Sequence, residues 1–208
     1  IEYNYGGTSY FRIRNTVRQQ SPPFDIQIQD NYIFTAAFGS GLLRSSNSGN
    51  SWEKVILPPS NVSILTPEQD YFWTSNYNGQ TINRFDVRSD LNLRGFGLHI
   101  DSNNQVWYGS ANGINISPDA LSAPTDSISW KHINFNNSSN GLLGDWVIEI
   151  EEDPTTNTIW MTNWVIDGQR GEKFGIVSTS DNGETFEQHL IGEKINSIGF
   201  KDGAIFAA

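Results

Sequence analysis

The sequence predicts an all-β protein, on three observations. The chain is rich in aromatic residues, with 7 Trp, 7 Tyr and 12 Phe against a single Met, and aromatic residues favour strands. It carries 19 Gly among many Asn, Ser and Thr residues, which are the residues of tight turns. Turn residues also recur roughly every 8–12 positions, whereas apolar residues do not follow the i, i+3, i+4, i+7 pattern of a helix.

A short pattern recurs along the chain: an apolar residue, an aromatic residue, any residue and then a small residue. The aromatic positions, which we call anchors, follow one another at intervals of 39, 34, 53 and 46 residues, with a mean of 43. This mean lies in the range of about 40–50 residues that is typical of four-stranded propeller blades. The sequence therefore predicts a β-propeller of antiparallel four-stranded blades, with an anchor in the second strand of each blade. The anchors are Phe34, Trp73, Trp107, Trp160 and Phe206.

The repeat divides the chain, residues 1–208, into one propeller segment of about four blades and two blade fragments. The predicted blades span 24–57, 61–93, 97–135 and 146–191, and the fragments span 1–20 and 195–208. The chain starts without a Met and stops within a predicted strand. We therefore expect a piece of a longer protein, whose remaining blades are partners of this segment. Without them, apolar blade faces are expected to be exposed at both ends.

Two stretches far apart in the sequence, SSNSGNSW (45–52) and STSDNGETF (178–186), share the order Ser/Thr, Asp/Asn, Gly and aromatic. A third copy starts at Ser117 and is completed at Trp130 after an insertion. Asp and Asn side chains accept nearby backbone N–H bonds, and Gly adopts positive φ without strain. We therefore predict structural turns between the third and fourth strands of a blade, each returning its aromatic residue to the core. The residues of these box turns are Ser45, Asn47, Gly49 and Trp52; Ser117, Asp119 and Trp130; and Thr179, Asp181, Gly183 and Phe186.

A metal ion or other cofactor is not expected. A calcium loop needs several oxygen ligands including carboxylates, and the turn at 45–52 contains no carboxylate. His99, His132 and His189 lie far apart in the sequence, without the spacing of a zinc site, and the chain has no Cys. No glycine-rich phosphate loop or dinucleotide fingerprint is present either.

The box turns resemble the Asp-box (BNR) repeats of β-propellers, which occur in sialidases, xyloglucan-cleaving glycosidases, sortilin-type sorting receptors and photosystem-assembly factors. The stretch DSNNQVWYGSANGINIS (101–117) is also similar to the periplasmic propeller repeats of bacterial hybrid two-component sensors. The resemblance covers most of residues 24–208. In these families the box lies away from the ligand face, so the resemblance implies an architecture and leaves the ligand open.

Two stretches of the sequence offer candidate catalytic residues, and each also has a structural interpretation. Tyr10-Phe11-Arg12-Ile13-Arg14 is similar to the Phe/Tyr-Arg-Ile-Pro motif of sialidases, which implies that Arg12 grips a substrate carboxylate. However, Arg14 replaces the Pro and no Tyr-Glu nucleophile pair is found, so an Arg-x-Arg strand on a solvated face is the other interpretation. Glu149 and Glu151 alternate with Ile148 and Ile150, which favours a solvent-facing strand over a pair of catalytic carboxylates.

Charge and hydropathy exclude two classes of partner. The formal net charge of −10 and a sequence pI of about 4.6 argue against nucleic acid, because phosphate binding depends on Lys and Arg. No apolar run approaches the roughly 18 residues that a membrane-spanning helix needs. We therefore expect no membrane insertion in this segment.

Ligands are expected on the face opposite the box turns, where second strands lead into third strands. The longest of these connections, residues 163–175, carries Trp164 beside Asp167 and Arg170, a combination suited to stacking on a sugar or anchoring a peptide. The alternative is that Trp164 packs over the edge of its blade. The other expected rim residues are Asn76, Tyr77 and Asn112.

The interpretation we favour is a non-catalytic propeller of a secreted, periplasmic or cell-surface protein, bacterial in origin, that binds a protein, peptide or glycan. The main alternative is a fragment of a glycoside hydrolase, sialidase-like or xyloglucanase-like, whose catalytic residues lie partly outside the segment. A purely structural repeat in a large surface protein is a third reading. Because one fold serves many functions, only a site can separate these classes.

Overall fold

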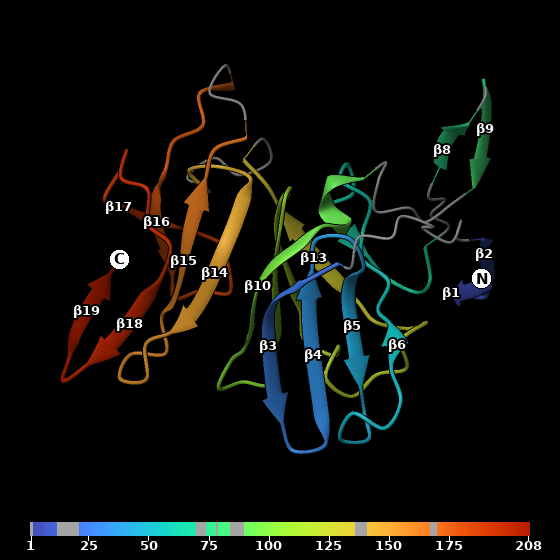
Figure 1. Ribbon diagram of the computed structural model, residues 1–208, viewed down its shortest axis with the longest axis horizontal. Coiled ribbons are helices and arrows are strands. Elements are labelled where there is room, and N and C mark those ends of the chain that lie inside the picture. The colour runs from blue at the N-terminus through green and yellow to red at the C-terminus, as the bar shows by residue number, and fades with distance from the viewer. Residues whose placement is uncertain are drawn as a thin grey trace.

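A computed structural model describes residues 2–11, 21–69, 74–77, 79–83, 90–135, 141–166 and 170–208. Three antiparallel sheets lie side by side and make up most of the molecule (Figure 1). In each sheet, four consecutive strands pair with their neighbours in chain order. The prediction of an all-β protein with four-stranded propeller blades is confirmed.

The blades are named I to III in chain order. Blade I consists of β3 (Pro23–Gln29), β4 (Tyr32–Ala37), β5 (Gly41–Ser45) and β6 (Glu53–Lys54). Blade II consists of β10 (Gly95–Ile100), β11 (Val106–Ser110), β12 (Gly113–Ser117) and β13 (Trp130–Ile133). Blade III consists of β14 (Trp146–Glu152), β15 (Ile159–Trp164), β16 (Gly175–Thr179) and β17 (Glu187–His189).

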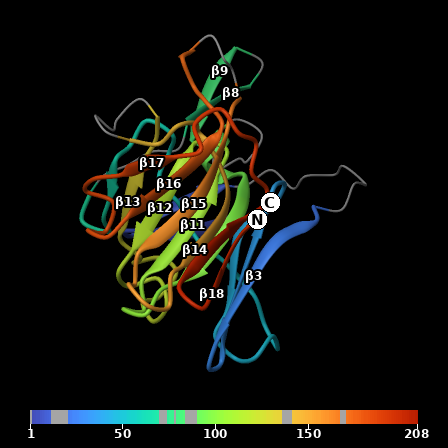
Figure 2. The ribbon, with the colours of Figure 1, turned by 90° about the vertical axis from the view of Figure 1, so that its left-hand side faces the viewer.

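The first strands of the blades are neighbours in space. β10 packs beside β3 on one side and beside β14 on the other, and Figure 1 shows β10 between these two strands, while Figure 2 views the row of blades from the side of β17. A final hairpin, β18 (Ile198–Lys201) and β19 (Ala204–Ala207), packs beside β14 and β15. The blades therefore adjoin through their first strands, as the blades of a propeller do around its axis.

The anchors occupy equivalent positions wherever they can be compared. Each described anchor lies in the second strand of its own sheet: Phe34 in β4, Trp107 in β11, Trp160 in β15 and Phe206 in β19. In the first strand of each blade, Gln27 pairs with Phe34, His99 with Trp107 and Glu151 with Trp160. Trp73 lies outside the described residues.

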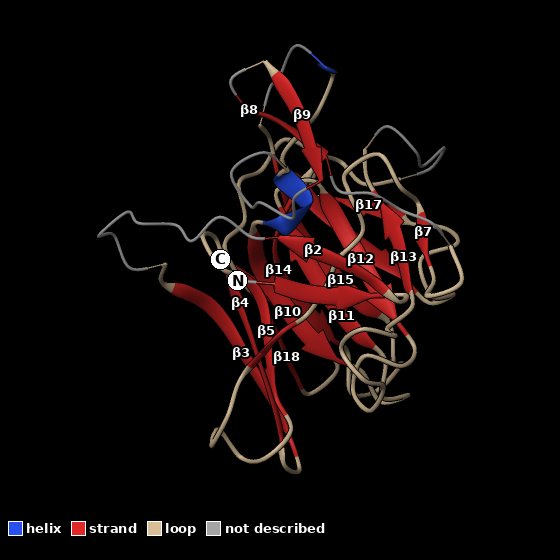
Figure 3. Ribbon diagram, turned by 90° about the vertical axis from the view of Figure 1, so that its right-hand side faces the viewer, coloured by secondary structure: helices blue, strands red, loops and turns tan. Residues whose placement is uncertain are grey.

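Of residues 61–93, which are expected to form a blade, the structure describes 61–69, 74–77, 79–83 and 90–93. β7 (Ile64–Leu65) pairs with β13 as a fifth strand of blade II. β8 (Thr74–Tyr77) and β9 (Gln80–Asn83) pair only with each other, in a hairpin that stands apart from the blades (Figure 3). The described residues of this segment form no four-stranded sheet, and blade I packs directly against blade II.

The cause is visible in the apolar residues of the segment. Leu65 and Leu93 are fully buried in the core between blades I and II, while η1 (Leu91–Leu93), a single 3-10 turn, leads into β10. Leu65 and Leu93 therefore contribute to the core that blade II shares with blade I.

Two apolar clusters fill the spaces between the blades. One lies between blades I and II and includes Phe34, Leu98 and Tyr108; the other lies between blades II and III and includes Trp107 and Val147. At the two ends of the array, apolar side chains are exposed, as expected. These are Ile26 and Ile28 on β3, and Ile205 and Phe206 on β19.

At the N-terminal end of the described chain, β1 (Glu2–Tyr5) and β2 (Thr8–Phe11) form a further hairpin. It docks on the insertion that precedes β13, because the Tyr5 hydroxyl donates to the Ile128 carbonyl at 2.7 Å. Among the described residues, no helix is long and apolar enough to cross a membrane.

Candidate functional site

The three box turns share one hydrogen-bond arrangement. In each, the leading hydroxyl accepts a backbone N–H within the turn, and the Asp or Asn side chain accepts the N–H of the residue that leads back towards the sheet. The first set of bonds runs from Gly49 to Ser45 at 2.9 Å, from Ala120 to Ser117 at 2.9 Å and from Gly183 to Thr179 at 3.0 Å. The second runs from Ser51 to Asn47 at 2.8 Å, from Ser129 to Asp119 at 3.0 Å and from Thr185 to Asp181 at 2.9 Å. All of these bonds lie within the turns.

The box aromatics differ in burial. Phe186 and Trp130 are buried, whereas Trp52 is 43% exposed, so the expectation that Trp52 returns to the core was wrong. The difference lies in where each turn packs. A Cβ at Gly183 would lie 3.0 Å from both Ile116 and Ile133 of blade II, so that turn is pressed against the next blade. A Cβ at Gly49 would meet only Ile33 of its own blade, at 3.6 Å.

Trp164 packs on its own molecule. Its indole N–H donates to the Ile195 carbonyl at 2.7 Å, and the Lys194 ammonium lies 4.0 Å from the ring centroid. The side chain is half-buried. This arrangement matches the alternative in which Trp164 covers the edge of its blade.

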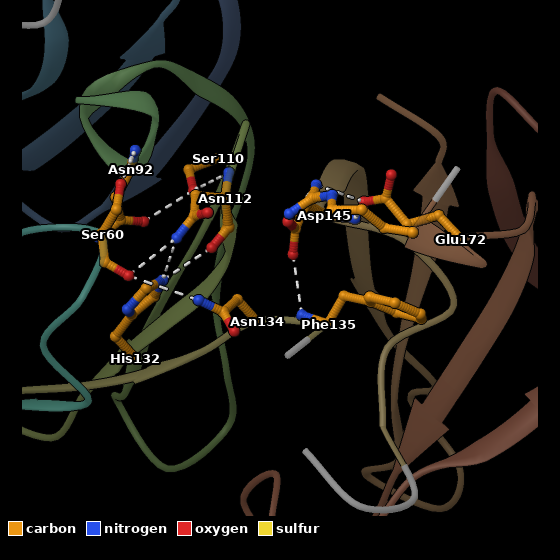
Figure 4. Close-up of polar contacts among 10 residues, drawn as sticks. Ser60, Asn92, Ser110, Asn112, His132, Asn134, Phe135, Asp145 and Glu172 are labelled. Carbon is orange, nitrogen blue, oxygen red and sulfur yellow. Dashed lines mark hydrogen bonds and ion pairs between the residues drawn. The ribbon is translucent and has the colours of Figure 1, made fainter. Parts of the chain in front are cut away.

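Arg170 neutralises two buried carboxylates. Its Nη2 lies 2.9 Å from Asp145 Oδ2 and 3.0 Å from Glu172 Oε1, and both acidic side chains are fully buried. Asp145 also accepts the Phe135 N–H at 2.8 Å (Figure 4). Because it pairs with two buried acids, Arg170 has a structural task of its own.

Asn112 is buried in a polar network that connects Ser60 and Asn92, which precede β10 in the chain, to blade II (Figure 4). Its Nδ2 donates to the Ser60 carbonyl at 3.2 Å, and its carbonyl lies 2.7 Å from His132 Nε2. Asn92 is the second residue with several bonds in this network. Its side-chain amide donates a hydrogen bond to that of Asn115 and accepts one from it, both at 2.8 Å. Burial lowers the pKa of His132, which favours its neutral imidazole, while the carboxylate of Asp90 accepts the N–H groups of Ser60 and Asn92 in the same network.

Of the predicted rim residues, Trp164, Arg170 and Asn112 adjoin residues 144–145: Arg170 pairs with Asp145, the Gly113 N–H next to Asn112 donates to the Asp145 carbonyl at 2.6 Å, and a Cβ at Gly144 would lie 2.5 Å from the Trp164 carbonyl oxygen. Asn76 and Tyr77 lie in β8, in the separate hairpin, and their side chains are outside the described part; Asp167 is outside it altogether. Arg12 and Arg14 of the sialidase-like motif also lie outside the described residues. As ligand contacts, Trp164, Asp167, Arg170, Asn76, Tyr77 and Asn112 remain predictions.

A different group of aromatic residues gathers where the first strands of the three blades begin. Phe96 lies at its centre, with ring centroids 5.3 Å from Phe24, 5.5 Å from Phe38 and 5.0 Å from Trp146. The Arg94 guanidinium covers the far side of Phe38 at 5.2 Å. Phe96 is buried, but Phe24 is 57% exposed. The Trp146 indole N–H has no acceptor among the described residues.

Each of these first strands contains a β-bulge at the equivalent place. The register shifts lie between Pro23 and Asp25 in β3, between Gly95 and Leu98 in β10 and between Val147 and Ile150 in β14. A bulge turns a side chain away from the regular alternation and is common beside functional sites. Here the extra residues fall next to the aromatic rings.

Carboxylates lie on the same strands, beside the rings. Asp25 Oδ2 accepts the Leu98 N–H of blade II at 2.8 Å, and Glu149 Oε2 accepts the Ile198 N–H of β18 at 3.2 Å. Burial raises the pKa of Asp25 and Glu151. Burial, followed by the nearby charge of Glu151, raises the pKa of Glu149 to about 7.

The expectation that Glu149 and Glu151 stand in open water was therefore wrong: both are half-buried. We call Phe24, Phe38, Phe96, Trp146, Asp25 and Glu149 the inner-strand site. It can offer apolar ring faces, carboxylate acceptors and a protonated Glu149 as a donor. The sequence signal that could have found it is an aromatic residue at the start of each first strand, in PFDIQI, GFGLHI and DWVIEI.

No protein-family model and no curated protein sequence matches the chain. Among solved structures, it is similar to an ancestral GH74 enzyme, with 20% identity and a TM-score of 0.40 over 83% of this chain and 26% of that one. It is similar to the extracellular domain of a one component system from B. thetaiotaomicron, with 16% identity and a TM-score of 0.39 over 89% and 28% of the two chains. PorZ, a surface component of the type-IX secretion system of Porphyromonas gingivalis, has 15% identity and a TM-score of 0.40 over 97% and 33%. The chain thus spans between 26% and 33% of the length of these proteins.

Proposed function

We propose that this chain is a non-catalytic β-propeller segment that binds a carbohydrate at the inner-strand site. The observation that carries the proposal is the cluster of four aromatic rings from three blades, with Phe24 more than half exposed. The C–H face of a sugar stacks on such rings, and its hydroxyls bond to carboxylates and to an indole N–H. Asp25 and Glu149 supply the carboxylates.

A location outside the cytoplasm is part of the proposal. It rests on the resemblance of the box turns to those of secreted, periplasmic and cell-surface propellers. Of the three ligand classes expected from the sequence, glycans are favoured because half-buried carboxylates lie on the same first strands as the rings. A peptide or protein ligand at the same rings is an outcome of the test below.

Glycan and peptide arrays probed with the wild-type chain test this function. Phe24→Ala removes an exposed ring with little effect on packing, and Phe206→Ala is its matched control, because Phe206 is 58% exposed and lies on β19, away from the ring cluster. A glycan retained by the wild type and by Phe206→Ala should bind Phe24→Ala about tenfold more weakly, which is about 1.4 kcal/mol. Retention of peptides alone, or equal glycan binding by both variants, would overturn the carbohydrate proposal.

Glycoside hydrolysis is the second candidate. One observation favours it: Glu149, whose pKa is raised to about 7, lies within the electrostatic influence of Asp25 and Glu151, and a protonated acid beside a carboxylate is what glycosidic cleavage requires. A Glu149→Gln variant separates the two functions. A hydrolase would lose release of the aglycone from bound substrates in this variant, whereas a binding module would release none in either form.

A further inference from the structure

Three carboxylates lie on the first strands that hold the ring cluster. Asp25 is on β3, and Glu149 and Glu151 are on β14. All three side chains are half-buried. Asp25 and Glu149 occupy equivalent positions, because each lies two residues before the one that pairs with the anchor of its blade. We call these three residues the first-strand acids.

Backbone hydrogen bonds fix two of these carboxylates against the next first strand along the row. Asp25 accepts the Leu98 N–H of blade II at 2.8 Å and also the N–H of Ile26 at 2.7 Å. Glu149 accepts the Ile198 N–H of β18 at 3.2 Å. The two charges are therefore held on the strands that carry the rings, and a ligand could move them away only by breaking these bonds.

The first-strand acids act on one another through their charges. Burial, followed by the charge of Asp25, raises the pKa of Glu151. Burial, followed by the charges of Glu151 and Asp25, raises the pKa of Glu149 to about 7. Within the described part of the chain, no Lys or Arg forms an ion pair with any of the three. Their negative potential is therefore not cancelled where they lie.

The cations of this region are placed differently. The Arg94 guanidinium lies 5.2 Å from the centroid of Phe38, at the ring cluster, whereas Arg170 is held by two other acids. Charges farther apart than about 8 Å are largely screened at physiological salt, so the balance near the rings matters more than the net charge of the whole chain. Even with Glu149 partly protonated near pH 7, the first-strand acids outweigh the single charge of Arg94.

We propose that the inner-strand site binds sugars that carry no negative charge and excludes uronic acids, sialic acids and sulfated sugars. This inference rests on the carbohydrate function proposed above and adds the charge class of the ligand. The rings by themselves do not discriminate, because the C–H faces of neutral and acidic sugars stack alike. The first-strand acids do, because like charges brought together in a half-buried site repel one another. Sialic acid, the ligand implied by the Arg12 motif, is among the excluded sugars.

Three forms of one glycan separate charge from shape. A neutral oligosaccharide retained by the wild-type chain on the array is oxidised at its primary hydroxyl groups, and the resulting uronic acid is then converted to its methyl ester. We expect the acid to bind about tenfold more weakly than the parent or worse, and the ester to bind within about threefold of the parent. Isothermal titration calorimetry measures all three. An ester as weak as the acid would overturn the proposal, because the loss would then come from shape.

Glu151→Gln tests the source of the repulsion. It removes the one first-strand acid whose side chain makes no hydrogen bond in the described structure. Glu187→Gln is the matched control, since it removes the same charge from an exposed position on β17, the outermost strand of blade III. The ratio of parent to acid affinity should fall by about twofold or more in Glu151→Gln and stay unchanged in Glu187→Gln.

The outcomes keep this proposal apart from the carbohydrate function. Equal ratios in Glu151→Gln and Glu187→Gln would overturn the charge selectivity and leave glycan binding standing. The same holds if the wild type retains acidic glycans in preference to neutral ones. Retention of no glycan at all would overturn both proposals.

Discussion

The rings of Phe96 and Trp146 lie 5.0 Å apart, centroid to centroid, across the junction of blades II and III. Their approach depends on the residue that follows Phe96. A Cβ at Gly97 would lie 3.0 Å from both the Ile148 carbonyl oxygen and the Glu149 Cα. The first strands of the two blades are thus in backbone contact, and this contact brings Glu149 to the inner-strand site.

Replacing Gly97 by Ala should force the two first strands apart. We expect Gly97→Ala to lower the free energy of unfolding by about 1–3 kcal/mol, the usual range for overpacking a well-packed contact. Gly199→Ala, in β18, is the matched control, because a Cβ there meets nothing within 4 Å. Urea denaturation measures both, and identical midpoints for the two variants would show that the strands are not in close contact at Gly97.

Arg170→Ala should destabilise the fold, whatever its effect on ligands. The substitution removes the guanidinium that pairs with the buried carboxylates of Asp145 and Glu172, and removing one partner of a buried pair costs about 3–5 kcal/mol. Arg170→Lys should fall between the wild type and Arg170→Ala, since it keeps the charge but not the guanidinium geometry. Thermal unfolding provides the measurement. If Arg170→Ala has the same melting temperature as the wild type, the burial of the two acids does not depend on Arg170.

The blades could be predicted from sequence because their signals are local. An anchor such as Phe34 or Trp160 sits within a strand, and each box turn is closed by residues a few positions apart. The inner-strand site could not be predicted in this way. Phe24, Phe96 and Trp146 precede their anchors by 10, 11 and 14 residues, and these unequal distances hide the equivalence. The site also needs three bulges and the contact at Gly97, which appear only when the blades are packed together.

The two box aromatics should differ in their importance for stability. Phe186 is 8% exposed in the core between blades II and III, so Phe186→Ala should cost about 3–5 kcal/mol of unfolding free energy. Trp52→Ala should cost much less, because nearly half of this side chain is already in water. Chemical denaturation of both variants tests the comparison. A larger loss for Trp52→Ala would mean that the box turn of blade I is packed against something other than its own blade.

Glu149 should make the stability of the chain fall as the pH rises. Its pKa is about 7 in the folded protein, against an ordinary value of 4.5, owing first to burial and then to the charges of Glu151 and Asp25. A carboxyl group with a raised pKa binds a proton more tightly in the folded state. Its contribution is therefore fully present below about pH 4.5 and is lost as the pH passes through 7.

The measurement is the urea midpoint of the wild type and of Glu149→Gln between pH 5 and pH 8. The amide has no proton to lose, so Glu149→Gln should gain stability relative to the wild type across this interval, while Asp25 and Glu151 remain in both proteins. Glu187→Gln, an exposed position on β17, is the control and should follow the wild type. Parallel curves for Glu149→Gln and the wild type would show that Glu149 is ionised throughout. In that case it could not act as the hydrogen-bond donor of the inner-strand site or as the acid of a hydrolase.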